Sequence, residues 1–595
     1  GGIDARDGND SWLVTTAGVY EVTLGSSLKG MVNVETIEGG GTGYSLQLAS
    51  SSAMAGTATT WDIDGVNSGT VSNGADSLAF ENFAALEGNE ANDAFEVAST
   101  GSIVSVSGVR SSNNADLVAL ENNTLQFEDA SNQWLLNGLH QGVVSVGHTT
   151  SFTEIQTLTG AGADSLTARN QANTWTLNGS TNTLAADVNT PSDTVTFSGM
   201  STLNGNDNSD EFVINASVAM MLNGGAGDDT FAFGATGAVI GAGAGINGGS
   251  ETDVDTLIAR DAENNWSLSS GANAIADSAD AGYVSNFSGI ERLEGSDTSI
   301  DNFDFADFIA FDISAGAGAG DIADYADVTG DVDIVVGAAT VAGVDRFIGN
   351  NNGLNPANTN SSTLTYSSNA NAAIGWAIFD FDAAANAAGA DGINDGTVAG
   401  TTEFVNFNNL AGGAGNDTFT FDQAAGAVVG LSGSIAGGGN SGATGDVIVA
   451  PNVDIIWSIN SAGSRFTYAN GLLNADETST NFSAIETVSS GFGDDTFNVV
   501  DAFNITLNAG DGADILNLPA DDLDITLGSA INGLALRDFE TVSADALYNN
   551  SLTVNSNISE VVLWDIDGEN SGSVTVGVSA AVAFENFQVL IGGGG

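Results

Sequence analysis

The chain has 595 residues, a formal net charge of −66 and only nine basic residues. This balance excludes nucleic acid and anionic membrane surfaces as partners, because both bind basic patches, and it makes cations the natural partners. The hydrophobic content of 42% is too high for a disordered acidic tail, and no apolar run is long enough to cross a bilayer. We therefore expect a folded chain without membrane insertion.

Glycine and proline usage favours one structural class. The chain contains 78 glycines, four prolines and no cysteine. Few prolines suit a backbone that donates its N–H groups to long β ladders, since proline cannot donate. Short alternating apolar runs between Gly/Asn/Asp turns are typical of β-strands, so the composition predicts an all-β fold.

Taken in chain order, the first element of each module is a strand that begins with tryptophan. These strands are WDIDGVNSGTV at Trp61, WLLNGLHQGVV at Trp134, WTLNGSTNTL at Trp175, WSLSSGANAI at Trp266 and WDIDGENSGSV at Trp564. A second strand follows, as FENFAAL at Phe80, FTEIQTL at Phe152, FSGIERL at Phe287, FSAIETV at Phe482 and FENFQVL at Phe584. The eight tryptophans mark about eight modules, and we interpret these Trp and Phe residues as core packing.

An acidic, glycine-rich turn comes next in each module. GGAGDDTFAF at Gly224 returns as GGAGNDTFTF at Gly412, and related turns begin after Leu203, Leu222 and Ile246. A period near twenty residues predicts one continuous parallel β-solenoid over residues 1–595, with a longer loop insertion near 350–400. In this register Phe231 points inward between Phe212 of one neighbouring coil and Leu257 of the other.

The two complete turns match the nonapeptide G-G-x-G-x-D-x-U-x, where U is a large apolar residue. In this they resemble the calcium-binding repeats of hemolysin-type (RTX) proteins and giant bacterial repeat adhesins. The resemblance implies positive φ at the glycines and Ca²⁺ at the turns. The candidate ligands, with Asp164 and the stacked Asp255, are Asp210, Asp228, Asp229, Asn416, Asp417, Asp494, Asp495, Asp511 and Asp514.

The match to this family is partial, because the family repeats its nonapeptides back to back and here single copies occur. A second interpretation of the same residues therefore stays open. Asp and Asn side chains also cap turns by accepting backbone hydrogen bonds, and diffuse counter-ions would then balance the charge.

No catalytic constellation is evident. The only imidazoles are His140 and His148, eight residues apart, and no nucleophile or metalloprotease motif surrounds them. Arg6, Arg169 and Arg260 are expected to pair with nearby turn acids. We do not predict an enzyme; the alternatives are a carbohydrate-active β-helix enzyme or a glycan-binding adhesin module.

The last and first residues align with an internal stretch. LIGGGG followed by GGIDARDGNDSW matches LTGAGADSLTARNQANTW, which places Leu590 with Leu158, Ile3 with Leu166 and Trp12 with Trp175. We therefore expect copies joined end to end, or one longer tandem chain. The function expected is structural: an extracellular repeat protein of a bacterial surface adhesin or fibre, with cations, and possible contacts to glycans or cell surfaces, as partners.

Overall fold

A computed structural model describes residues 3–4, 9–24, 31–32, 34–49, 57–108, 122–185, 194–234, 238–241, 243–249, 252–277, 282–336, 341–350, 361–366, 374–379, 395–422, 430–439, 445–469, 479–501, 505–522, 524–527, 534–554, 561–576 and 580–592. These residues form strands, turns and bends, without a helix. Within these ranges there is thus no helix long and apolar enough to cross a membrane. The all-β prediction is confirmed.

The chain divides into two compact units. Unit 1 comprises Gly1–Trp266 and Gly271–Ser296, and unit 2 comprises Ser267–Ser270 and Asp297–Gly595. Each unit has its own apolar core. Much of the loop insertion expected near 350–400 lies outside the described residues. Its described part contains strands β34 (Ser362–Tyr366), β35 (Gly375–Ile378) and β36 (Gly396–Val398).

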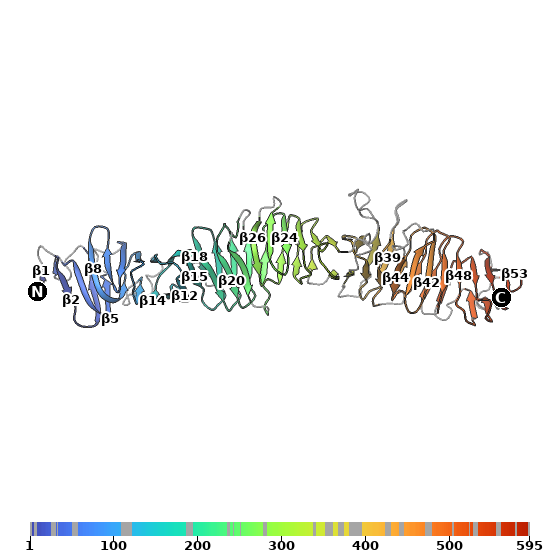
Figure 1. Ribbon diagram of the computed structural model, residues 1–595, viewed down its shortest axis with the longest axis horizontal. Coiled ribbons are helices and arrows are strands. Elements are labelled where there is room, and N and C mark those ends of the chain that lie inside the picture. The colour runs from blue at the N-terminus through green and yellow to red at the C-terminus, as the bar shows by residue number, and fades with distance from the viewer. Residues whose placement is uncertain are drawn as a thin grey trace. The chain divides into compact units, whose positions relative to one another are not determined.

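Parallel strand pairing builds unit 1. Successive parallel neighbours are, for one column of strands, β16 (Thr174–Leu177), β19 (Glu211–Ile214), β21 (Thr230–Phe233), β23 (Thr256–Ile258) and β27 (Arg292–Glu294). A second column contains β12 (Gln133–Gly138), β15 (Thr157–Thr167), β18 (Thr194–Asn206), β20 (Met221–Gly225), β22 (Gly245–Gly249) and β26 (Gly282–Ser288). Figure 1 shows β15, β18 and β20 of this column side by side.

Unit 2 repeats the arrangement. One column contains β42 (Ile455–Ile459), β46 (Thr496–Val499), β48 (Ile515–Asn517), β51 (Thr541–Ser543) and β55 (Val582–Glu585). Another contains β35, β39 (Thr418–Phe421), β41 (Val447–Val449), β45 (Thr487–Ser489) and β47 (Ile505–Asn508). Successive strands in such a column are about 4.8 Å apart, so equivalent side chains lie directly above one another.

The predicted stacking register is confirmed. Phe231 lies opposite Phe212 on one side and Leu257 on the other, and all three side chains are fully buried. The rings of Phe212 and Phe231 are stacked, with centroids 4.8 Å apart and planes at 11°. The column begins with Trp175, whose ring stacks on Phe212.

In most modules the Trp and Phe strands are joined by an antiparallel strand, which the solenoid period did not predict. In one module β6 (Thr59–Gly65) pairs antiparallel with β7 (Ser68–Ser72), and β7 pairs antiparallel with β8 (Ser77–Glu87). The tryptophan therefore packs edge-on against the phenylalanine of its own module. Such contacts join Trp61 to Phe80, Trp134 to Phe152, Trp175 to Phe197, Trp457 to Phe482 and Trp564 to Phe584.

Replacing the central ring of the stacked column tests this packing. We expect Phe231→Ala to lower the free energy of unfolding by about 3–5 kcal/mol, because it leaves a cavity between two buried neighbours. The control is Phe492→Ala in the related turn SGFGDDTF, since Phe492 is 67% exposed, and its effect should be within about 0.5 kcal/mol. Equal losses of stability in denaturant-induced unfolding would contradict the register.

Candidate functional site

The repeated spacing within the acidic turns places one aspartate immediately before a buried strand. Asp229 precedes β21, Asp417 precedes β39 and Asp495 precedes β46, and all three side chains are 0% exposed. Strand alternation directs the next odd positions, such as Phe231, into the same interior. The repeated turn sequence thus places a carboxyl group and an aromatic ring in the core together.

These aspartates form a hydrogen-bonded ladder. Asn173 N–H donates to Asp210 Oδ1 (2.7 Å), and Asp210 N–H donates to Asp229 Oδ1 (2.7 Å). Asp229 N–H donates to Asp255 Oδ1 (2.8 Å), and Asp255 N–H donates to Glu291 Oε2 (2.9 Å). We call Asn173, Asp210, Asp229, Asp255 and Glu291 the first ladder. Each of its four carboxyl groups accepts the backbone N–H of the residue before the neighbouring parallel strand, whereas the Asn173 side chain donates through Nδ2 to Asp210 Oδ1 (2.8 Å).

Ladders of the same kind occur in unit 2. In one, Ile374 N–H donates to Asp417, Asp417 N–H to Asp446 and Asp446 N–H to Glu486. In another, Ile455 N–H donates to Asp495, Asp495 N–H to Asp514 and Asp514 N–H to Glu540. A shorter one joins Asp301 N–H to Asp321 and Asp321 N–H to Asp345. Two of these ladders end on a glutamate, Glu486 or Glu540, as the first ladder ends on Glu291. The glutamates were not among the sequence candidates, although FSGIERL and FSAIETV carry them at the same place.

The first glycine of the turn leaves room for the ladder. A Cβ at Gly224 would lie 2.0 Å from Asp229 Oδ2 and 2.5 Å from the carbonyl oxygen of Gly248. Gly227, immediately before the acid pair Asp228–Asp229, has φ of 104° and so adopts the left-handed conformation. The resemblance to calcium repeats implies the positive φ of Gly227. It does not imply the role of Gly224, which allows a carboxyl group to approach the backbone closely.

The second carboxyl oxygen of most inner aspartates is buried without a partner among the described residues. This holds for Oδ2 of Asp210, Asp229, Asp255, Asp446 and Asp514. Asp417 differs, because its Oδ2 accepts the N–H of Gly413 (2.8 Å), and Asp495 has Ser490 beside its carboxyl group. Buried polar atoms are nearly always paired, so each of these oxygens requires a partner. The oxygen either carries a proton and donates it to a neighbouring acceptor, or it contacts a water molecule or a cation.

Asn123 has an amide side chain in an equivalent position, and its contacts favour a proton on the carboxyl group. At Asn123, Oδ1 accepts the N–H of Asp93 (2.8 Å) while Nδ2 donates to the carbonyl of Glu154 (3.1 Å). Gly108 adjoins both groups, as Gly248 adjoins Asp255 Oδ2 and the carbonyl of Gly289. Asp255 therefore presents an oxygen where Asn123 presents a donor. A proton on Asp255 Oδ2 would turn this oxygen into a donor on the same side as the Gly289 carbonyl, as Nδ2 of Asn123 is on the side of the Glu154 carbonyl.

The environment favours that proton. Burial, followed by the repulsion of Asp255, Asp210 and Asp253, raises the pKa of Asp229 to about 8 from an ordinary value of 3.8, against the opposing effect of its hydrogen bond. Burial likewise raises the pKa of Asp495 to about 7 and that of Asp255 to about 6. The inner aspartates are thus much weaker acids than the net charge of the chain suggests.

The other candidate ligands lie at the surface of the turns. Asp228 is exposed and its Oδ1 accepts the N–H of Val254 (2.9 Å), and Asp494 is exposed and its Oδ1 accepts the N–H of Ala513 (2.9 Å). Asp511 is exposed, whereas Asn416 is half-buried. Asp164 is buried and receives hydrogen bonds on both oxygens, from Asn132 and Trp134. The structure thus separates an inner set of acids from an outer one.

Calcium needs six to eight oxygen ligands. An inner aspartate offers one oxygen that already accepts an N–H group and one that faces a carbonyl in a closely packed interior. In the part of the chain that the structure describes, no three acidic or histidine side chains gather closely enough to hold a metal ion. The inner acids are a poor ligand set for calcium. An ion at the outer acids would need backbone carbonyls or water to complete its shell.

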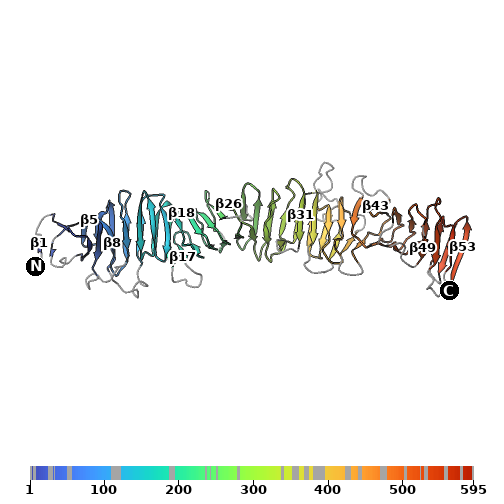
Figure 2. The same cartoon turned by 90° about the horizontal axis from the view of Figure 1, so that it is seen from below.

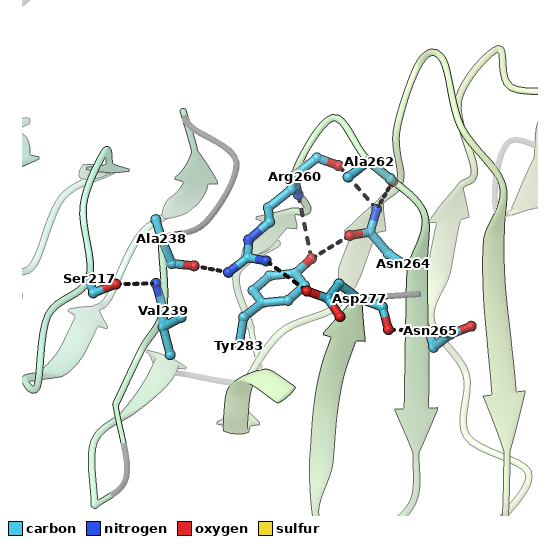
Figure 3. A network of polar contacts seen from close by, with 9 residues as sticks. All are labelled: Ser217, Ala238, Val239, Arg260, Ala262, Asn264, Asn265, Asp277 and Tyr283. Carbon is cyan, nitrogen blue, oxygen red and sulfur yellow. Dashed lines mark hydrogen bonds and ion pairs between the residues drawn. The ribbon is translucent and has the colours of Figure 1, made fainter. Parts of the chain in front are cut away.

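A separate polar network surrounds Arg260, which is 4% exposed (Figure 3). Its guanidinium carbon lies 3.7 Å from the ring centroid of Tyr283, and Nη1 lies 3.8 Å from Asp277 Oδ2. Tyr283 Oη donates to Asn264 Oδ1 (2.7 Å). The acid paired with Arg260 thus belongs to strand β25 (Asn273–Asp277), not to a glycine–aspartate turn as expected. Arg6 lies outside the described residues.

Unit 2 contains a cavity of about 700 Å³ next to the turn SGFGDDTF. Its lining includes the exposed ring of Phe492 and three acids, Asp511, Asp538 and Glu540. The corresponding position in the two complete turns is alanine, at Ala226 and Ala414. Phe492 was not predicted to be a functional residue, although an aromatic residue in place of this alanine distinguishes its turn from the other two.

Neither a family model nor a curated protein matches this chain. Its function must therefore be inferred from the arrangement of its own residues.

Replacing Asp229 by its amide tests the protonation of the ladder. A buried carboxyl group with a raised pKa stabilises the fold fully below pH 4, and this contribution is lost as the pH rises towards 8. We expect Asp229→Asn to keep the Oδ1 acceptor and to raise stability at pH 8 by on the order of 2 kcal/mol, with a much smaller effect at pH 4. Thermal melting at both pH values measures this.

The control is Asp229→Ala, which also removes the acceptor for the N–H of Asp210. It should lower stability at pH 4, where Asp229 is neutral because its pKa is raised, by about 1–3 kcal/mol. Parallel pH profiles for wild type and Asp229→Asn would show that Asp229 keeps an ordinary pKa.

Proposed function

We propose that this chain is a structural protein built as a parallel β-solenoid, a rod-forming segment of an extracellular fibre or giant surface adhesin. The observation that carries the proposal is the column from Trp175 to Leu293. In it, successive parallel strands place one apolar side chain and one ladder side chain above the next. Stacking of this kind depends only on nearest neighbours and extends without limit, which suits a structure whose task is length and stiffness.

The charge supports an extracellular setting with cationic partners. A surface with 75 acidic and nine basic residues repels other acidic surfaces and concentrates cations around it. Glycans or cell surfaces would then be reached through the exposed turns. Calcium is the cation that the turn sequences favour, and we assign it to the outer acids such as Asp228 and Asp494, bound with water.

A second candidate function is a carbohydrate-active enzyme or glycan-binding module, which the cavity next to Phe492 favours. An exposed aromatic ring beside acids is the composition that sugar recognition uses, through stacking and polar contacts. Incubation with neutral and acidic polysaccharides distinguishes the two: chain cleavage would support an enzyme, and binding without cleavage that depends on Phe492 would support an adhesin module.

Electron microscopy of the isolated chain tests the main proposal. If the columns belong to a solenoid with about twenty residues per coil, the particle should be an unbranched rod on the order of 120 Å long, because each coil adds about 4.8 Å. A compact globular particle of the same mass would contradict the structural role. The measurement requires no activity assay.

Calcium dependence is tested by melting in chelator and in millimolar calcium. We expect calcium to raise the melting temperature by a few degrees at most, since loosely held ions contribute RT ln(1 + [L]/Kd) only when their concentration exceeds Kd. Asp494→Asn should reduce this response, whereas Asp229→Asn should not. If the response disappears with Asp229→Asn instead, calcium is bound by the inner ladder.

A further inference from the structure

Two nearly identical stretches of the chain have different neighbours. Trp61 begins WDIDGVNSG and Trp564 begins WDIDGENSG. In the first, β6 pairs antiparallel with β7 and parallel with β9 (Asp93–Val97), which places Trp61 opposite Phe95 and Ile63 opposite Val97. Trp61 and Ile63 are consequently 0% exposed. The sequence WDIDG is therefore made for a strand with partners on both sides.

The second stretch has a partner on one side only. β53 (Val562–Gly568) pairs antiparallel with β54 (Ser571–Val576) and is the last strand of its sheet, with no further partner in the described ranges. It lies next to the C-terminus (Figure 2). Ile566, the equivalent of Ile63, is 63% exposed, and Leu563 is 64% exposed. An apolar strand edge of this kind is a template for another strand.

The strand that fits this edge is present near the start of the chain. β1 (Ile3–Asp4) pairs parallel with β4 (Met31–Val32), with Ile3 opposite Met31, and no other described strand pairs with it. Leu166, the residue that aligns with Ile3, has Leu203 on one side and Trp134 on the other. Met31 is therefore the neighbour of Ile3 that corresponds to Leu203. Ile3 has no described neighbour that corresponds to Trp134.

The tryptophan strand that Ile3 lacks corresponds to β53. Trp134 leads through an antiparallel strand to Phe152 and then to Leu158, and Trp564 leads through β54 to Phe584 and then to Leu590. The residues after Leu158 lead to Leu166. In the alignment of the last and first residues, those after Leu590 correspondingly lead to Ile3. Each of the two strands thus supplies the neighbour that the other is missing.

Resting on the proposed fibre function, we propose that β53 of one copy pairs in parallel with β1 of a second copy, with Trp564 opposite Ile3. The register follows β12 with β15, in which Trp134 lies opposite Leu166 and Leu135 opposite Thr167. Asp565 of one copy then lies opposite Asp4 of the other. The interface continues the parallel strand pairing of β12 with β15 from one copy into the next.

Charge opposes this contact and apolar burial drives it. Each copy carries a net charge of −66, and the register itself places two aspartates opposite each other. Salt screens such repulsion over a distance of about 10 Å at 0.1 M and about 3 Å at 1 M. Association should therefore strengthen as the salt concentration rises, the reverse of an interface held by ion pairs.

Engineered cysteines test the register, and the chain has none of its own. The 595-residue chains carrying Asp565→Cys and Asp4→Cys are mixed in 0.5 M NaCl and oxidised. We expect a disulfide-linked heterodimer at least about fivefold above that formed by Asp567→Cys with Asp4→Cys. The two-residue offset adds about 7 Å along the strand, which puts the paired Cα atoms beyond disulfide reach.

Association is measured in parallel by sedimentation. Ile566→Asp should abolish the salt-induced increase in mass, and Leu547→Asp, at a 90% exposed apolar residue on neither β53 nor β56 (Val589–Ile591), should leave it intact. Circular dichroism confirms that both variants fold. Loss of association in both variants would overturn the assignment to β53.

The outcomes separate this interface from the proposed function. Fibres that form without the Asp565–Asp4 crosslink overturn the interface and leave the fibre function standing. Rods that stay single at every salt concentration overturn the interface and the end-to-end assembly, but leave the solenoid. Compact particles overturn the proposed function itself.

Discussion

The hydrogen bond from a backbone N–H to the side-chain oxygen in the equivalent position of the next strand fixes the geometry of this protein. It recurs from Asn173 to Glu291 and in several ladders of unit 2. Because one oxygen must reach one N–H group at strand spacing, a slip of even one residue would break the bond and bury a carboxyl group without a partner. The ladder therefore sets the register, and the apolar columns follow it.

The same constraint explains why the acids are so numerous and yet so close together. Like charges at strand spacing repel, and that repulsion grows in a closely packed interior. The chain reduces it by placing amides at some of these positions, as at Asn123 and Asn173, and by holding acids such as Asp229 in surroundings that favour the neutral form. The formal charge thus overstates the charge of the interior and describes mainly the outer turns.

Sequence periodicity could predict the apolar register, because the spacing from Phe212 to Phe231 to Leu257 follows one repeated word. It also located most of the inner aspartates, though not Asp446, but not what their oxygens contact, since that depends on a neighbouring strand 19 to 43 residues away. The antiparallel strands between Trp and Phe were missed even though a turn signal was present. Asn67 in NSG and Asn570 in the second copy have positive φ, as hairpin turns require.

The short reach of the ladder bonds bears on how such a chain acquires its structure. In the first ladder no bond joins residues more than 37 positions apart, so each strand finds its partner as soon as a few dozen further residues are available. Contacts of this kind involve little loop-closure entropy and allow structure to spread from one end, strand upon strand. A chain of this design can fold while it is still being synthesised, and its length can grow by duplication of a module without slowing that process.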